Sequence, residues 1–161
     1  MSVRKQHKRY STPRRLFEKA RIEEENLLLK NYGLKNKREV WKADFAVSKL
    51  RNLAKSFITA SQEEQKKFID RQVEKGLVKK GAQIDDILAL TKEAILDRRL
   101  QTIVLKKGIA KTPKSARQLI THRHVMINSE KVTVPSYFVN LSDEGKIQFT
   151  GKERKHQPEE K

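Results

Sequence analysis

Apolar residues in the first part of the chain recur every three or four positions, the spacing of helices that bury one face. A first helix is predicted to begin at Thr12, an N-cap residue that precedes Pro13, and to end near Asn31, before Gly33. Its buried face is expected to carry Leu16, Ile22 and Leu27.

Two longer helices are predicted to follow a basic connector at residues 34–41 (LKNKREVW). The first should bury Ala46, Leu50, Leu53, Phe57 and Ile58. The second should open with a capping box at residues 61–64 (SQEE), end at Gly76 and bury Phe68, Ile69 and Val73. Residues 12–93 are therefore predicted to form a helical N-terminal domain, and residues 1–11 a disordered basic tail.

Residues 94–149 change from a helical period to an alternating one. A helix is predicted from the stripe Leu96, Leu100, Ile103 and Val104, with Gly108 as its stop. Thr112 and Pro113 should start a second helix that turns Ala116, Leu119 and Ile120 inward.

Alternation then predicts short strands: Val125 and Ile127, residues 132–134 after a four-residue turn at 128–131, and Ile147 with Phe149. The expected fold class is α+β, a helical N-terminal domain plus a compact module of two helices packed on a small antiparallel sheet. Residues 150–161 are expected to be a flexible tail.

Charge is high and unevenly distributed along the chain. Of the 161 residues 35% are charged and 36% apolar, and 37 Lys and Arg against 20 Asp and Glu give a net charge of +17. Residues 1–21 and 98–149 each carry +7, whereas residues 61–97 carry −1. Two basic regions around a neutral middle favour a polyanionic partner, and nucleic acid is the commonest one.

Other partner classes are disfavoured by the same residues. No apolar run approaches the roughly 18 residues of a membrane-spanning helix, and the N-terminus is too basic for a signal peptide. The chain has no Cys, which removes disulfides and thiolate zinc sites.

Several segments resemble one known family. Residues 115–125 (SARQLITHRHV), with Ile127-Asn128, Lys131-Val132 and residues 134–137 (VPSY), resemble the RNA-binding domain of the S-four family, the fourth small-subunit ribosomal protein. Residues 10–15 (YSTPRR), 32–41 (YGLKNKREVW) and 97–102 (DRRLQT) are similar to its archaeal and eukaryotic branch. The resemblance covers about residues 8–149, in the family's order.

The resemblance implies a structural constituent of the small ribosomal subunit, in the cytoplasm. Such a protein binds a multi-helix junction in the 5′ region of small-subunit ribosomal RNA early in assembly. It also contacts neighbouring ribosomal proteins where messenger RNA enters, and messenger RNA is an implied further partner. No cofactor, membrane or small-molecule substrate is expected, and no enzymatic activity.

The residues expected to contact RNA are basic or polar side chains of both predicted parts of the chain. They are Arg14, Arg15, Lys35, Lys37, Arg38, Arg98, Arg99, Lys106, Lys107, Lys111, Thr112, Lys114, Arg117, Gln118, His122, Arg123 and Lys131. Of these, Arg117 and Arg123 are predicted to face solvent. Because aromatic residues are few and the phenylalanines, Phe17 included, are assigned to apolar stripes, a platform that reads folded RNA by shape and phosphates is favoured over a reader of single strands.

The chain departs from the family pattern at three places. Arg123 stands where the family usually has Gly, which adds a cation or costs strain if φ is positive there. Asn128-Ser129 replaces a frequent Asn-Gly, which weakens the prediction of a tight turn. The zinc-binding cysteine cluster of some bacterial relatives has no counterpart, since Cys is absent.

For the individual residues that could take part in catalysis or metal binding, a structural role is favoured over a catalytic one. His122 and His124 lack metal-site spacing and companion ligands, so helix capping, packing or phosphate contact is favoured. Asp85 and Asp86 are expected to open a helix, and Ser136 lacks a nucleophile motif. Two alternatives remain: an RNA-modifying or aminoacylating enzyme that kept this module, and a non-specific DNA-compacting or chaperone-like protein.

Overall fold

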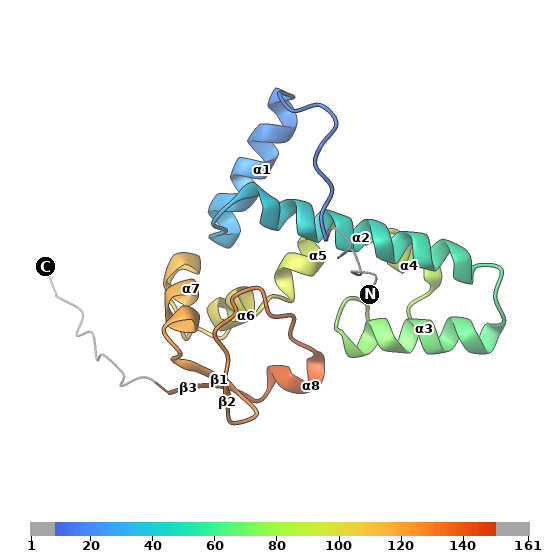
Figure 1. Ribbon diagram of the computed structural model, residues 1–161. Coiled ribbons are helices and arrows are strands. Elements are labelled where there is room, and N and C mark those ends of the chain that lie inside the picture. Colours follow the sequence, from blue (N-terminus) through green and yellow to red (C-terminus); the bar gives the residue numbers. More distant parts are fainter. Residues whose placement is uncertain (1–8, 151–161) are drawn as a thin grey trace, which may run out of the picture.

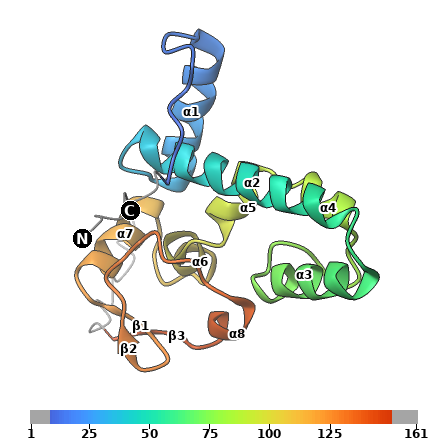
Figure 2. The same ribbon diagram turned by 45° about the vertical axis from the view of Figure 1, so that its right-hand side comes forward.

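The computed structural model describes residues 9–150, which form two parts around one long helix (Figure 1). The N-terminal part contains α1 (Lys19–Tyr32), α2 (Lys37–Phe57), α3 (Gln62–Glu74), α4 (Ile84–Leu88) and α5 (Lys92–Asp97). Helix α2 packs against the other four, and α1 projects away from the body in both views (Figures 1 and 2). The predicted α+β class is confirmed.

The core of the N-terminal part is small. Ala54, Phe68, Ile87 and Leu90 form its buried cluster, where the rings of Phe57 and Phe68 stack with centroids 4.6 Å apart. The predicted buried face of α2 is partly wrong, because Leu53 and Ile58 are exposed. The helix instead buries Val40, Ala43, Val47 and Ala54. The side chains of these residues are short, so several neighbouring helices can pack closely against α2.

Helix α1 begins at Lys19 and not at Thr12, so the predicted start is wrong. The Arg21 guanidinium donates to the carbonyls of Arg15 and Leu16, and these contacts hold residues before the helix in a loop. Leu16 and Leu27, predicted to be buried, are 62% and 60% exposed. Gly33 does end the helix, with φ 59°.

The predicted connector at residues 34–41 is largely helix, because α2 begins at Lys37. The Glu39 side chain accepts a hydrogen bond from the Lys35 backbone N–H at 3.1 Å, and this reach-back contact stabilises the helix start. At α3 the helix begins after Ser61 as predicted, but the serine side chain makes no capping hydrogen bond. Asp85 and Asp86 lie in the first turn of α4, as expected.

The C-terminal part contains α6 (Leu100–Lys106), α7 (Pro113–Thr121), β1 (Val125–Ile127), β2 (Glu130–Lys131), α8 (Leu141–Glu144) and β3 (Ile147–Phe149). The antiparallel sheet has the order β2-β1-β3. Its core is one cluster of ten buried residues from Leu100 to Ile147. We call residues 98–149 the module.

Two local features of the module differ from expectation. Ile127 pairs with Glu130, so the hairpin turn has only two residues, Asn128 and Ser129. Both have positive φ. The expected turn was therefore too long and the second strand was placed too late. Helix α8 was not predicted.

The single helix predicted across Leu96 and Val104 is broken between α5 and α6. Arg99 adopts an extended conformation, with ψ 143°. The freed backbone groups pair with a later segment, since Leu100 N–H donates to Tyr137 O and Val139 N–H donates to Arg98 O. All four predicted stripe residues are nevertheless buried.

The predicted boundary near residue 93 separates the two clusters, but α5 packs on α2 across it. The division into domains at that residue stays a prediction. The predicted tails lie mostly outside the described residues. Tyr10, assigned to the N-terminal tail, stacks on Trp41 with ring centroids 6.3 Å apart.

Candidate nucleic-acid interface

Helix α7 has one buried face and one basic, polar face. Thr112 accepts a hydrogen bond from Ser115 N–H at 3.1 Å and Pro113 is the first helical residue, as predicted. Ala116 and Ile120 are fully buried in the core. Lys114, Arg117, Gln118 and Thr121 follow one another at helical spacing on the opposite face. The helix carries two basic residues and no acidic residue.

The turn after α7 extends this surface. Arg123 N–H donates to Ile120 O and His124 N–H to Leu119 O, which closes the helix as a Schellman motif. Arg123 therefore occupies the left-handed position, with φ 64°, where glycine is usual. His122, Arg123 and His124 are all exposed.

The outer face of the sheet carries a second set of exposed side chains, which reaches the hairpin. Met126 pairs in register with Lys131 on β2 and with Gln148 on β3, so these three side chains form one row. Their neighbours in β1, Val125 and Ile127, point into the core. Lys131 is exposed on an edge strand.

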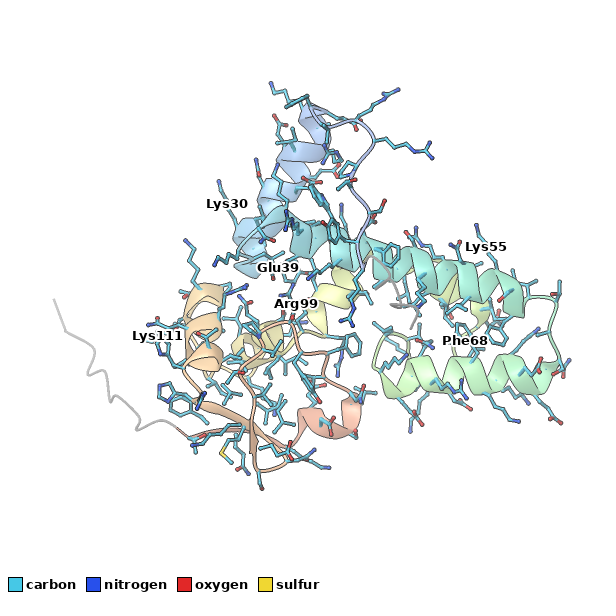
Figure 3. The ribbon with its side chains drawn as sticks, viewed as in Figure 1. Lys30, Glu39, Lys55, Phe68, Arg99 and Lys111 are labelled. Atoms are coloured by element: carbon cyan, nitrogen blue, oxygen red, sulfur yellow. The ribbon has the colours of Figure 1, made fainter. Side chains whose placement is uncertain are left out.

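A largely buried carboxylate joins this surface to the helical part. Glu39 on α2 contacts the guanidinium of Arg117 in two places, at 3.1 and 3.3 Å, and that of Arg99 through a short ion pair. Only 14% of the Glu39 side chain and 8% of the Arg99 side chain are exposed. Figure 3 shows Glu39 and Arg99 where α2 meets the module. Desolvation raises the pKa of Glu39, but hydrogen bonds from Arg117 and Arg99 outweigh it and hold that pKa below its ordinary value.

Three further interactions tighten the same joint. The buried Gln101 amide donates to the carbonyls of Tyr32, Gly33 and Pro113, at 2.8–3.1 Å. Gly33 lies so close to Pro113 that an added Cβ would be 2.6 Å from the proline Cβ. The Tyr32 hydroxyl donates to Asp97, and burial together with this carboxylate raises the pKa of Tyr32 to about 12. Helix α7 is thus fixed against the turn that links α1 to α2.

Thirteen of the predicted RNA-contacting residues are exposed. They are Arg14, Arg15, Lys35, Arg38, Lys106, Lys107, Lys111, Thr112, Lys114, Gln118, His122, Arg123 and Lys131. Four of them also have side-chain partners. Lys106 pairs with Asp97 at 3.3 Å and Lys107 donates to the Glu144 carbonyl, while Thr112 caps α7 and Arg38 lies over the Tyr10 ring.

The remaining four make contacts within the protein. Arg99 is buried against Glu39, and Arg98 donates to Val139 O and Glu144. Arg117, expected to face solvent, is half-buried in the joint, so that expectation is wrong. Lys37 lies 3.5 Å from the buried Glu25.

Sequence reasoning missed the groups that build the site. Glu39 could have been found from its place three residues after Asn36, the spacing of a reach-back cap. Nothing local marks Gln101, whose three partners lie 12 to 69 residues away. Phe17 was assigned to an apolar stripe, yet it is 92% exposed.

The histidines and acidic residues form no evident metal site in the part of the chain that the structure describes. His122 and His124 stack with ring centroids 6.4 Å apart. Within residues 9–150, no three His, Cys, Asp or Glu side chains gather as metal ligands do. None of the described helices combines the length and apolar character needed to span a membrane.

Comparison with known proteins agrees with this geometry. Residues 98–144 match the model of the S4 domain family. The chain is 45% identical to the small ribosomal subunit protein uS4 of Methanoregula boonei, over 92% of this chain and 85% of that protein. It is 46% identical to that of Methanospirillum hungatei, over 91% and 86%, and 45% identical to that of Thermoplasma volcanium, over 89% and 75%.

Proposed function

The chain belongs to the uS4 family of small ribosomal subunit proteins, with an S4 domain of the kind that binds RNA, and on that premise we propose that it binds small-subunit ribosomal RNA as a structural component. The binding surface is the outer face of α7, the turn at residues 122–124 and Lys131, with the exposed Lys35 and Arg38 beside it.

The observation that carries this proposal is the outer face of α7. Its exposed side chains are basic or polar, and the helix carries no carboxylate of its own to neutralise them. The Lys114 ammonium and the positive end of the helix dipole at the start of α7 suit phosphate oxygens. A double-stranded RNA helix is recognised through its shape, phosphates and 2′-hydroxyls, which a rigid surface of this kind can contact.

We further propose that the RNA target is a multi-helix junction in the 5′ region of the small-subunit RNA, bound early in assembly. The rigid joint at Glu39 supports this, because it holds Lys35 and Arg38 of one part at a fixed position relative to Lys114 of the other. Fixed contact groups on two parts of a protein suit RNA helices that leave a junction in different directions. Neighbouring ribosomal proteins, and messenger RNA where it enters the subunit, complete the proposed set of partners.

The test compares small-subunit 5′ RNA with unrelated RNA and with DNA of equal length over a range of salt. The wild-type chain should prefer its own RNA, and the log–log salt dependence should have a slope of several units, about 0.7–0.9 for each phosphate neutralised. Arg123→Ala with Lys131→Ala should weaken binding and reduce the slope by roughly 1.5.

The matched control is Lys66→Ala with Lys67→Ala, which removes the same charge from α3 at the far end of the molecule (Figure 1). Its affinity should stay close to wild type. Equal losses for the two double variants, or equal binding to DNA and unrelated RNA, would favour the non-specific nucleic-acid binder instead.

The proposed role includes no catalytic step. Incubation of purified protein with small-subunit RNA should leave the RNA unchanged in length and in nucleoside composition, as checked by gel and mass spectrometry. A modified nucleoside that appears only when the folded protein is present would favour the alternative of an RNA-modifying enzyme.

A further inference from the structure

The loop that precedes α1 is held in place by contacts with the protein interior. At one end Tyr10 stacks on Trp41, and the Arg38 guanidinium lies 5.9 Å from the Tyr10 ring centre. At the other end the Arg21 guanidinium donates to the carbonyls of Arg15 and Leu16, both at 2.9 Å. The loop is therefore fixed on both sides of residues 11–14.

The anchor of this loop is itself buried. Glu25 is 2% exposed and pairs with Arg21 at 2.5 Å. It also accepts a hydrogen bond from the Trp41 indole at 2.9 Å and lies 3.5 Å from Lys37. One carboxylate thus holds both Trp41, on which Tyr10 stacks, and Arg21, which holds the carbonyls of the loop.

The end of this loop, just before α1, displays an exposed aromatic ring close in the chain to two arginines. Phe17 is 92% exposed and Leu16 62% exposed, and Arg14 and Arg15 are exposed beside them. The other five phenylalanines of the chain are buried or half-buried. A single exposed apolar side chain is ordinary, but a nearly bare phenylalanine on a loop anchored by buried groups indicates a surface kept ready for a partner.

The neighbouring charges indicate which partner. An exposed aromatic ring with arginines in the same loop is a combination that can stack on an unpaired base while the cations hold nearby phosphates. We propose that Phe17 stacks on an unpaired base of the small-subunit RNA, with Arg14 and Arg15 on the flanking phosphates. This proposal rests on the proposed function for its partner, and it adds a contact to a base at a site remote from α7.

The experiment substitutes Phe17 in the full chain and measures affinity for small-subunit 5′ RNA. Phe17→Ala should lose about 5- to 150-fold in affinity, the range for removal of one base–aromatic stack. The slope of the salt dependence should stay unchanged, because the substitution removes no cation. Phe17→Tyr should keep the wild-type affinity. Circular dichroism should show an unchanged fold, since the side chain contacts solvent.

Phe17→Leu separates stacking of the ring from a merely apolar contact with the RNA. A leucine keeps apolar surface but has no ring, so it should bind RNA as weakly as alanine if the contact is a stack. Leu16→Ala is the matched control and should bind like wild type. Arg14→Ala with Arg15→Ala should instead reduce the salt slope by about 0.7–0.9 for each phosphate that the variant no longer neutralises.

Two failures remain distinguishable. A wild-type chain without preference for its own RNA would overturn the proposed function. A wild-type chain with that preference, but with Phe17→Ala or Phe17→Leu binding equally well, would overturn the stacking contact alone. In the second case Phe17 does not act as a base platform.

Discussion

In the module, ten buried apolar side chains form one continuous cluster, whereas the cluster between α2, α3 and α4 contains only four. The helical part has fewer buried apolar contacts, and two sets of ion pairs add to them, one between α1 and α2 and one between α2 and the module. Glu25 joins α1 to α2 through Arg21, Trp41 and Lys37, and Glu39 joins α2 to the module through Arg99 and Arg117. Both carboxylates are largely buried.

The difference shows two ways of holding a basic protein together. The module relies on hydrophobic burial, which depends little on pH or salt. The helical part relies on ion pairs that replace lost solvation only while both partners are present. The same contrast decides which changes should damage which part.

The largest effect is expected from Glu39→Ala. The substitution leaves Arg99 and Arg117 as uncompensated cations in a poorly solvated joint, and breaking a buried pair in this way costs about 3–5 kcal/mol. The free energy of unfolding from urea denaturation, read by circular dichroism, measures it. Glu74→Ala, at an exposed glutamate of α3, should stay within about 0.5 kcal/mol of wild type. Equal losses of stability in the two variants would show that the ion pairs of Glu39 stabilise the protein no more than an exposed glutamate does.

Acid should weaken the helical part and its joint before the module. The pKa values of Glu39 and Glu25 are held below the ordinary 4.5, despite a desolvation contribution that raises both. A carboxylate with a depressed folded-state pKa contributes stability that is present above the unfolded pKa and lost as pH falls through the folded one. The free energy of unfolding should therefore drop as pH falls below 4.5.

Amide hydrogen exchange locates that loss. Amides of α1 and α2 should lose protection in acid before those of α7 and β1. Glu39→Gln should flatten the pH dependence, because the neutral amide cannot titrate. Simultaneous loss of protection in both parts would mean that they unfold as one unit.

A medium effect is expected at the start of α7. Thr112→Ala removes a hydrogen bond to Ser115 N–H and should cost about 1 kcal/mol. Ser61→Ala is the matched change in the helical part, where the serine side chain makes no capping bond, and its cost should be smaller. Thermal denaturation of the two variants gives the difference.

The smallest effect, and one of opposite sign, is expected from Arg123→Gly. A left-handed backbone conformation costs a non-glycine residue about 1–2 kcal/mol, and glycine removes this strain. Glycine also makes the unfolded chain more flexible, which offsets about 0.5–1 kcal/mol of that gain in stability. The variant should therefore be more stable by roughly 0.5–1 kcal/mol, as measured by urea denaturation. It should nevertheless bind RNA more weakly, because the substitution removes a cation. A variant that is more stable but binds RNA as tightly as wild type would show that the Arg123 side chain does not contact RNA.

The elements of the module that could be predicted are those whose signals are local. Thr112 with Pro113, Gly108 and the alternation at Val125 and Ile127 each concern neighbours in sequence, and the structure confirms these elements. The start of α1 could not be predicted, since it depends on the contact of Arg21 with carbonyls of the loop. The break at Arg99 likewise depends on pairing with residues near Tyr137 and on Glu39.

The candidate site was predicted in composition but not in detail. Residue type cannot tell whether an arginine faces a phosphate outside the protein or a carboxylate inside it. Arg123 and Arg117 look alike in the sequence, yet one is exposed and the other contacts a glutamate 78 residues earlier. Distant partners of this kind are settled only by the folded chain.

The joint at Glu39 also has a consequence for the order in which the chain is made. Synthesis proceeds from the N-terminus, and Glu39 precedes Arg99 by 60 residues and Arg117 by 78. A nascent chain that has only just completed α2 therefore carries this carboxylate without either cation. The ion pairs that hold this carboxylate can form only after residues 99 and 117 have been synthesised, so a contact between the two parts of the protein depends on a residue made near the beginning.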